Sequence, residues 1–478
     1  MPRRMSIMRE VWIEYGNARL SIQVPDHAVV ITPEMYRDPP AVDPVQATRE
    51  ALQKPLGLPP IGDLVKRGDR VVIAFPDRVK GGMHERSHRR VAIPLILEEL
   101  DRAGVRREDI TLICAIGLHR KNTVEEFQSY LGEEVVRAFW PDRLINHDAE
   151  DPQGIISLGE DEFGDTVEFN RKVAEADLAI LLGHVLGNPY GGYSGGYKMP
   201  TTGLTTWRSI RSHHVPQSLY RDDFLPVSTG SHFRHQLRAI GRTIEARTGK
   251  RFFIVDAVLG TEAQILGVYA GAADDVERES WTLAERRTHF YLREKFDVLV
   301  VGLPRDFHYG PGMGTNPILM MQAIGATLVR CFDVFTPGGV IIAASICDGW
   351  FNEDWFPATR EVFELLKGVS DRSAMRRFEE EVSTRSAYVT AYRQAFAYHP
   401  FHAFSMVYMG GLALRHTSAI FIVGAKEPAY AEAMGGIPVT SFSEALHRAE
   451  KHVGKNPRIL VLPGYLTKAP VHLRYAGG

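Results

Sequence analysis

The chain has 478 residues, 44% of them hydrophobic and 24% charged, and its formal net charge at pH 7 is -2. This length and composition are sufficient for a globular protein with a large buried core, and they favour two domains over one. The near-neutral charge excludes a general basic surplus of the kind that binds nucleic acid or an anionic membrane, so we expect a small-molecule partner.

The cysteines and the apolar segments indicate the compartment. Cys114, Cys331 and Cys347 are far apart and lie in or beside apolar runs, which is typical of buried reduced thiols and not of a disulfide framework or a zinc site. No uninterrupted apolar segment approaches the roughly 20 residues of a membrane-spanning helix, and the first residues lack the apolar core of an export signal. The sequence therefore predicts a cytoplasmic protein that does not enter a membrane.

The predicted elements begin with a short β lead-in, because residues 15–33, YGNARLSIQVPDHAVVITP, alternate polar and apolar side chains. Helical patterns follow at 86–104 and 361–368. Seven apolar runs rich in Val, Ile and Leu have the form of strands buried on both faces: 71–75, 110–117, 176–183, 296–302, 338–345, 419–424 and 458–464. Strands alternating with helices predict an α/β fold of two doubly wound domains, with a cleft between them and the β lead-in at the N-terminus.

The domain boundary is predicted near residue 290. A charged helical pattern over 284–296 precedes a fresh strand at 296–302, which suggests that a second unit starts there. We therefore expect an N-terminal domain over 1–290 and a C-terminal α/β domain over 291–478. The tail after the last strand contains proline and glycine and can pack back on the first domain.

Two predicted strands end in side chains that can carry chemistry. His119 follows the strand 110–117, and an imidazole titrates near neutral pH, which suits proton transfer; a histidine bonded only to backbone is the alternative. Asp77, Arg78 and Lys80 follow the strand 71–75 and precede two glycines. Such a group can bind an anionic or hydroxylated ligand, although a solvated turn would have the same composition.

A third strand end leads into a glycine-rich loop, LLGHVLGNPYGGYSGGYKMPTTG, that contains His184, Asn188 and Lys198. Glycines allow backbone amides to approach a ligand, so a loop of this kind ahead of a helix favours an anion site. It is not a P-loop, because Met199 follows the lysine, and it does not match the dinucleotide fingerprint. Lys198 is a candidate phosphate ligand or a lysine that bonds covalently to a carbonyl-type group. A flexible surface loop is the alternative.

Further histidines follow downstream. His213 and His214 lie in a predicted helix, where one of two adjacent residues can face a site, but a single imidazole is not a metal signature. The glycine-rich loop 308–317 contains His308 and Asn316, and we expect it to close the cleft from the second domain. The remaining histidines have no informative spacing, among them His232, His235, His399 and His402.

Together these motifs resemble the nickel-dependent lactate racemase family, whose members are nickel-pincer nucleotide 2-hydroxyacid racemases and epimerases. The resemblance covers most of residues 15–220: YGNARLSIQVPD, ATREAL, KPLGLPPIGDLVKRGDRVVI, the strand-end aspartate, GLHR, the loop Ser194-Gly195-Gly196-Tyr197-Lys198, and a histidine sixteen residues after that lysine. Past about residue 300 it rests only on LPRD and GGVIIAAS. The chain is thus identified as a divergent member of the family.

The resemblance implies an isomerase that uses nickel and a nickel-pincer nucleotide, pyridinium-3,5-bisthiocarboxylic acid mononucleotide. It implies that Lys198 is joined to this cofactor and that His214 completes the nickel coordination, with the other cofactor contacts at Asp77, Lys80, Ser194, Gly195 and Gly196. A hydride would move from the substrate to the cofactor while a histidine, here His119, removes the hydroxyl proton. The implied partners are a small-molecule 2-hydroxy acid substrate and, transiently, the enzymes that mature the cofactor. The implied oligomeric state is a monomer or a homodimer.

The sequence also departs from the family. Asn188 stands where the family has its second acid/base histidine, and an amide cannot exchange a proton at neutral pH. Either His184 or Tyr190 replaces it, or the enzyme works with one base. Lys80 replaces an arginine, and the glutamine and lysine that the family uses from its second domain have no clear counterpart. These changes favour a larger or differently charged substrate than lactate. The alternative is a nucleotide-binding relative that performs a half-reaction or none.

Overall fold

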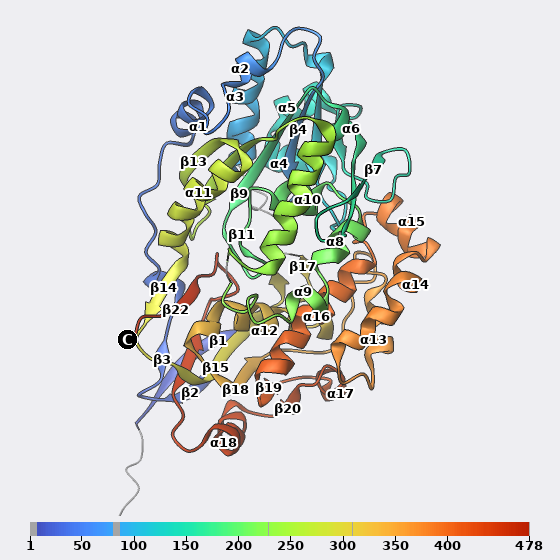
Figure 1. Cartoon of the computed structure of the whole chain (residues 1–478). Helices are drawn as coiled ribbons and strands as arrows, with labels where there is room; N and C mark the ends of the chain where they lie inside the picture. The colour runs from blue at the N-terminus through green and yellow to red at the C-terminus, as the bar shows by residue number, and fades with distance from the viewer. Residues whose placement is uncertain (1–6, 80–86, 228, 308, 478) are drawn as a thin grey trace, which may run out of the picture.

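The computed structural model describes residues 7–79, 87–227, 229–307 and 309–477. Two main sheets lie one above the other in Figure 1, and helices cover both faces of each. The α/β fold predicted from the alternating strands and helices is therefore confirmed. All seven apolar runs predicted as strands form strands of these two sheets.

The first sheet has six strands in the order β13-β12-β9-β4-β5-β6. All pairs are parallel except β12 with β13, so the carboxyl ends of the parallel strands meet at one edge. The strands are β4 (Val71–Pro76), β5 (Ile110–Ala115), β6 (Leu144–Asn146), β9 (Leu178–Val185), β12 (Phe253–Leu259) and β13 (Ile265–Ala272). This edge is where an α/β sheet presents functional residues.

Side chains alternate across the first sheet, and each face has its own core. Ile73 and Phe75 pack under α3 and α4, whereas Val72 and Ala74 pack under α7 and α10. The helices of this half are α1 (Pro44–Gln53), α2 (Ile61–Leu64), α3 (His88–Arg102), α4 (Val124–Leu131), α5 (Glu133–Phe139), α6 (Arg171–Glu175), α7 (Lys198–Gly203), α8 (Trp207–His213), α9 (Pro216–Leu219), α10 (His232–Thr248) and α11 (Ala273–Thr288). The alternation explains why these strands are apolar on both sides.

The second sheet has eight strands: β2-β1-β15-β18-β19-β20 in order, with β21 between β15 and β3. They are β1 (Met8–Gly16), β2 (Ala18–Pro25), β3 (Val29–Val30), β15 (Phe296–Pro304), β18 (Phe335–Ala344), β19 (Ala419–Val423), β20 (Ile437–Val439) and β21 (Ile459–Leu462). Its helices are α12 (Pro317–Cys331), α13 (Thr359–Leu366), α14 (Glu379–Ser383), α15 (Ser386–Gln394), α16 (Phe401–His416), α17 (Pro428–Ala433) and α18 (Phe442–Val453).

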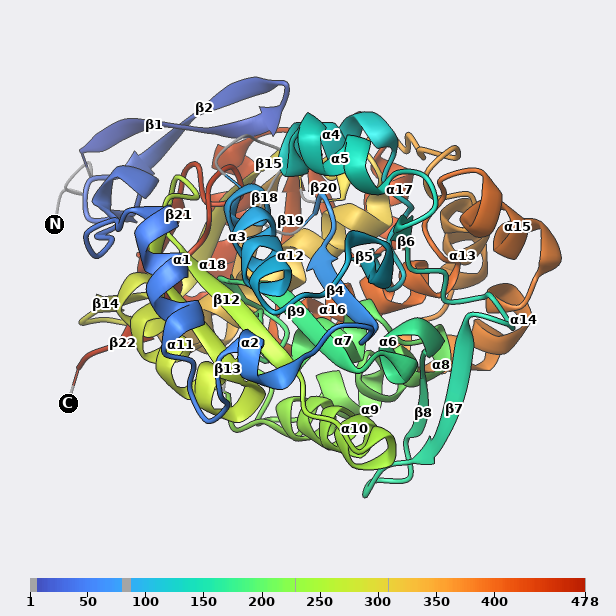
Figure 2. The same cartoon turned by 90° about the horizontal axis from the view of Figure 1, so that it is seen from above.

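The predicted β lead-in is the antiparallel hairpin β1–β2, which lies at the edge of the molecule in Figure 2. It pairs with β15 in parallel, so residues 8–16 share a sheet with residues 296–304. The division of the chain at residue 290 stays a prediction.

The prediction of a helix over 284–296 is wrong from residue 289 onward. The helix α11 ends at Thr288, and β14 (His289–Leu292) follows, pairing in parallel with β22 (His472–Tyr475). Phe290 and Leu292 pack on the large core, so alternation across a strand replaces the helical period there.

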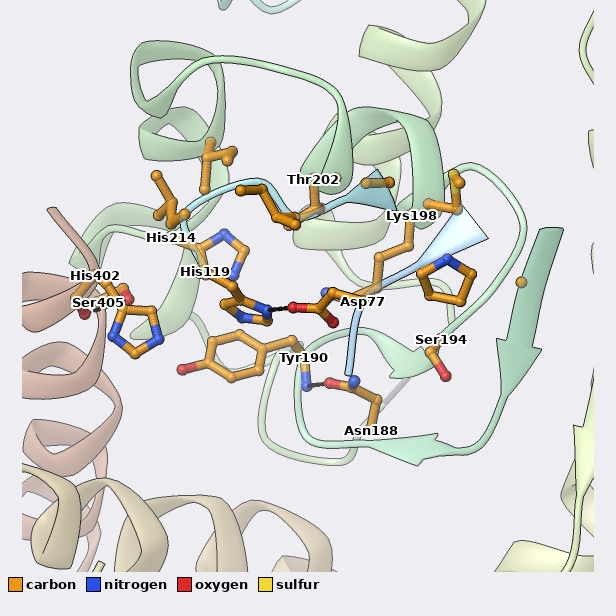
Figure 3. A pocket seen from close by; sticks show the side chains of 18 of the residues that line it. Asp77, His119, Asn188, Tyr190, Ser194, Lys198, Thr202, His214, His402 and Ser405 are labelled. Carbon is orange, nitrogen blue, oxygen red and sulfur yellow. Dashed lines mark hydrogen bonds and ion pairs between the residues drawn. The ribbon is translucent and has the colours of Figure 1, made fainter. Parts of the chain in front are cut away.

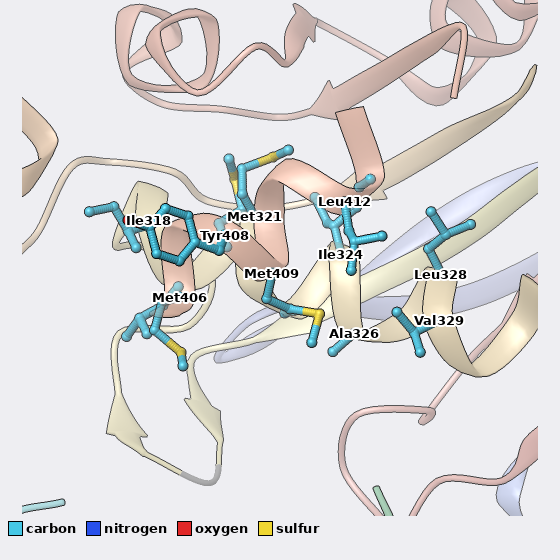
Figure 4. Close-up of a cluster of buried hydrophobic side chains, with 14 of the residues drawn as sticks. Ile318, Met321, Ile324, Ala326, Leu328, Val329, Met406, Tyr408, Met409 and Leu412 are labelled. Carbon is cyan, nitrogen blue, oxygen red and sulfur yellow. The ribbon is translucent and has the colours of Figure 1, made fainter. Parts of the chain in front are cut away.

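The helices α12 and α16 form the centre of the large core (Figure 4). A Cβ at Gly325 would lie 2.0 Å from the carbonyl oxygen of Met409, so glycine is required for the two backbones to approach. The window Pro317–Val334 is long and apolar enough to cross a membrane, but 89% of it is buried inside the protein. It is therefore accounted for as a core helix. Cys114, Cys331 and Cys347 are buried and free of disulfides, as predicted.

Candidate active site

A cavity of about 120 Å³ lies at the carboxyl edge of the first sheet (Figure 3). Asp77 directly follows β4, His119 follows β5, and His184 lies near the end of β9. Tyr309 and three residues of α16 contribute to the lining from the other half of the chain. The lining includes eight residues predicted from sequence: Asp77, His119, His184, Asn188, Ser194, Gly195, Lys198 and His214.

His119 and Asp77 form a hydrogen-bonded pair in this cavity. The distance from Nδ1 of His119 to Oδ2 of Asp77 is 2.7 Å, and the Asp77 side chain is 1% exposed. The bond assigns the proton to Nδ1, which leaves Nε2 as the atom that can accept one. The imidazole also lies near the rings of Tyr309 and His402, at centroid distances of 5.6 and 5.8 Å. The pair therefore has the geometry of an oriented general base.

The glycine-rich loop is held by buried carboxylates on β12 and α11. The amide of Gly196 donates to Oδ2 of Asp256 at 2.8 Å, and the amide of Tyr197 donates to Oε1 of Glu277 at 2.8 Å. Gly195 has φ +81, and a Cβ there would lie 2.5 Å from Asp256. These two amides are used within the protein, so the predicted anion cradle does not include them. Gly196 is also outside the cavity lining.

Changing Asp256 to Asn is expected to flatten the pH dependence of stability. Burial raises the pKa of Asp256 to about 7, although the Gly196 amide lowers it. The folded protein therefore holds this proton between about pH 4 and 7, where the unfolded chain releases it, and stability falls as pH rises through that window. At about 1.4 kcal/mol per pKa unit, the loss reaches the order of 4 kcal/mol.

Thermal unfolding at pH 5 and pH 7.5 measures this loss. The Tm of the natural protein should fall more than that of Asp256→Asn between the two values. Equal falls in the two proteins would show that Asp256 ionises normally. Asp165→Asn provides a control in which a carboxylate that lies away from the loop is neutralised.

Lys198 is the first residue of α7, and its side chain is buried at the cavity wall. Its Nζ lies 4.9 Å from the ring centroid of Phe233 and 5.5 Å from that of Tyr190. A cation held over aromatic faces is stabilised by the negative potential of the rings. The amine is therefore positioned at the cavity wall over two aromatic rings, next to the glycine-rich loop.

His214, not His213, faces the cavity. The helix α8 ends at His213, and His214 follows it and stacks on Tyr190 at a centroid distance of 5.0 Å. Burial lowers the pKa of both imidazoles well below the ordinary value, and the Lys198 charge adds to this. Nδ1 of His214 is buried with no hydrogen-bond partner among the described residues. A neutral imidazole of this kind has the chemistry of a metal ligand.

No group of three or more His, Cys, Asp or Glu side chains in the described ranges could hold a metal ion by itself. A metal bound at His214 would therefore take most of its ligands from a cofactor. The donor set fits an ion that arrives already coordinated, and does not fit a metal site built from side chains alone.

Asn188 closes a turn of the loop. Its Oδ1 accepts a hydrogen bond from the amide of Tyr190 at 2.8 Å, where β10 (Gly187–Asn188) pairs with β11 (Gly192–Tyr193). Burial raises the pKa of the Tyr190 hydroxyl well above its usual value of 10, so it stays protonated at neutral pH. Of Asn188, Tyr190 and His184, the last is the side chain suited to exchanging a proton.

Some predicted residues lie elsewhere. Lys80 and His308 are outside the described residues. Asn316 caps α12, because its Oδ1 accepts from the amides of Ile318 and Leu319 at 2.9 and 3.2 Å. Three lining residues of α16 were not predicted: His402, Ser405 and Met406. Their signal was weak, consisting of two polar residues three apart in an apolar helix.

A second cavity of about 520 Å³ adjoins the first. The two share part of their lining, namely His184, Asn188, Tyr190, Ser194 and Tyr309. The second is completed by the loop 259–263, the segment 466–470 and one face of α12. A ligand that extends beyond the first cavity would therefore enter the second.

Comparisons with known proteins agree with these features. Residues 15–222 match the family model described as the lactate racemase N-terminal domain. A lactate racemase of Thermoanaerobacterium thermosaccharolyticum is 20% identical over 462 residues, covering 95% of this chain and 98% of that protein. A lactate racemase of Lactiplantibacillus plantarum is 26% identical over 226 residues, covering 47% of this chain and 50% of that protein.

Two solved structures share the fold. The lactate racemase apoprotein of Thermoanaerobacterium thermosaccharolyticum superposes with a TM-score of 0.70 at 19% identity, covering 98% of this chain and all of that one. A Thermotoga maritima protein superposes with a TM-score of 0.56 at 13% identity, covering 92% of this chain and all of that one. At these identities the likeness concerns the fold.

Proposed function

We propose that this chain, which belongs to the lactate racemase family as a divergent member, is a racemase or epimerase of a 2-hydroxy acid. The observation that carries the proposal is the shared cavity: the pair His119–Asp77 lies in one lining with Lys198 and His214. A base, an amine and a neutral imidazole at one strand edge are the groups that this reaction requires from the protein.

The residues fit a nickel-pincer nucleotide. Lys198 would hold the cofactor covalently, His214 would be the protein ligand to nickel, and Asp77, Ser194 and Gly195 line the same cavity. When bound, this cofactor supplies a hydride acceptor beside the metal. Contacts from Lys80 and Gly196 stay predictions, as do a cytoplasmic location, a monomeric or homodimeric state and transient binding to maturation enzymes.

The protein's own part in the reaction is proton transfer. Nε2 of His119 accepts the proton of the substrate hydroxyl, and Asp77 stabilises the imidazolium that forms. His184 lines the same cavity and is our candidate for the second base, in place of the histidine that Asn188 replaces. Both faces of the substrate carbon would then have an imidazole available.

Changing Asn188 to His tests the second base. We expect Asn188→His to raise racemisation of simple 2-hydroxy acids by a factor of the order of ten or to change substrate preference, because a histidine at this position adds a base to the one that His184 supplies. Initial rates on a panel of single-enantiomer acids, with cofactor loading confirmed by intact mass, measure the change. Asn188→Gln is the matched control, because it keeps an amide oxygen as acceptor and adds no titratable group. Unchanged rates across the panel would remove position 188 from the reaction.

A second function is favoured by Asn188 itself. With one base missing, the chain would act as a binding protein or would perform a half-reaction that stops at the 2-keto acid. Loaded protein incubated with one enantiomer distinguishes the cases, since a racemase forms the other enantiomer, a half-reaction forms keto acid, and a binding protein forms neither.

A further inference from the structure

One polar stripe crosses the otherwise apolar helix α12. Gln322, Ala326 and Arg330 are spaced by four residues, so they share one face, and all three line the larger cavity. The whole helix is buried, and most of its other side chains are aliphatic or methionine. A glutamine and an arginine on the cavity face of a core helix therefore need an explanation.

Arg330 is a buried cation that forms no ion pair with a carboxylate of the described residues. Its side chain is 4% exposed, Nη1 donates to the carbonyl of Ala326 at 3.3 Å, and Nε has no hydrogen-bond partner among the described residues. Burial lowers its pKa, and the groups that oppose this most are tyrosine and cysteine side chains, which are neutral at pH 7. A buried guanidinium in such surroundings is costly unless an anion joins it.

Two other cations that line this cavity already pair with carboxylates. Arg78 pairs with Glu126 at 3.1 Å, and Lys468 pairs with Glu262 at 2.7 Å. Asp306 also lines the cavity, but it is not among the groups that act most strongly on the pKa of Arg330. Within the described part of the lining, Arg330 is thus the cation left for a ligand's negative charge.

Arg330 also lies at a suitable place relative to the base. Tyr190 and Tyr309 line both cavities, and each is close enough to affect the pKa of Arg330. The ring of Tyr309 lies 5.6 Å from that of His119. A ligand that reaches from His119 into the second cavity therefore passes these tyrosines and enters the space that Arg330 lines.

We propose that Arg330, with Gln322 beside it, binds a second carboxylate of the substrate, so that the chain acts on a 2-hydroxy dicarboxylic acid. The guanidinium supplies two parallel N–H donors and Gln322 an amide donor, which match a carboxylate. A three-carbon monocarboxylic acid has no group for this site. The inference rests on the proposed function and names its substrate class.

Calorimetric titration of the full-length protein tests this with malate and lactate, which share the 2-hydroxy acid group and differ in the second carboxylate. We expect malate to bind at least about tenfold more tightly than lactate. Arg330→Gln should weaken malate binding about 100-fold and lactate binding less than about threefold, since removing one partner of a buried charge pair is costly. The affinity of Arg330→Lys for malate should lie between those of the natural protein and Arg330→Gln, because lysine keeps the charge but lacks the two parallel N–H donors.

Lys468→Gln is the matched control, because this cation lines the same cavity but is already paired, and it should change neither affinity more than about twofold. The Tm of Arg330→Gln should not fall, because an unpaired buried charge is removed. Equal weakening of both acids, equal affinity of the natural protein for both, or unchanged malate binding would each overturn the proposal. Racemisation assays on loaded protein are separate: Arg330-dependent malate binding without turnover would reject the proposed function alone.

Discussion

Changing His119 to Ala is expected to lower turnover by about 10²–10⁴-fold while the cofactor stays attached to Lys198. The loss follows from the proposed mechanism, in which Nε2 of His119 accepts the hydroxyl proton, because general-base catalysis contributes a factor of this size. Initial rates measure the first effect and the intact mass of the loaded protein measures the second. The two readouts separate a lost base from a lost cofactor.

Asp77→Asn is the matched variant for the same pair. The amide can still bond to Nδ1, but it no longer stabilises the imidazolium, so a smaller loss than that of His119→Ala is expected. Turnover of His119→Ala within about tenfold of the natural protein, with equal loading, would remove His119 from the base role. A pH profile in which both variants lose the same acidic limb would support a shared role for the pair.

The residues at the carboxyl ends of the strands in the first sheet were predictable, because the sequence patterns that indicate these strands are local. A continuous apolar run indicates a strand buried on both faces, and parallel strands bring their carboxyl ends together. Asp77, His119 and His184 could therefore be expected near one another from the positions where the runs end. The structure gives their common cavity and the 2.7 Å bond between the first two.

Other features depend on contacts between distant parts of the chain. Nothing local in residues 8–16 indicates a partner at residues 296–304, and only the fold pairs β1 with β15. His402 and Ser405 enter the cavity from α16 because that helix packs on α12 through glycines. Local periodicity specifies the elements, whereas such pairings are decided by the packing of the whole core.

The hydrogen-bond partners of the glycine-rich loop also could not be predicted from local sequence. Its composition predicts an anion cradle, because glycines expose backbone amides. The structure instead gives the amides of Gly196 and Tyr197 to Asp256 and Glu277, which lie 60 and 80 residues downstream. The glycines make room for these carboxylates, which hold the loop next to Lys198 through its amides. Sequence could identify the loop but not the partners of its amides.

Changing Lys198 to Arg is expected to abolish attachment of the proposed cofactor and to lower racemisation by at least about 10³-fold, because that cofactor would carry the hydride chemistry. Arginine keeps a cation over the rings of Phe233 and Tyr190, so the wall of the cavity should stay folded. It cannot form the amide-type bond that an amine forms. Intact mass and nickel content after co-expression with maturation enzymes measure attachment, and Tm measures folding.

Lys121→Arg is the control for this variant, because Lys121 is a partly buried lysine that pairs with Asp148 outside the cavity. It should load and turn over like the natural protein. An added mass that persists in Lys198→Arg would mean attachment at another residue. Racemisation by natural protein of unmodified mass would mean that the cofactor binds without a covalent bond, and Lys198 would then act only as a charge beside His214. Since burial is the largest cause of the lowered pKa of His214, that imidazole stays neutral and able to bind a metal in either case.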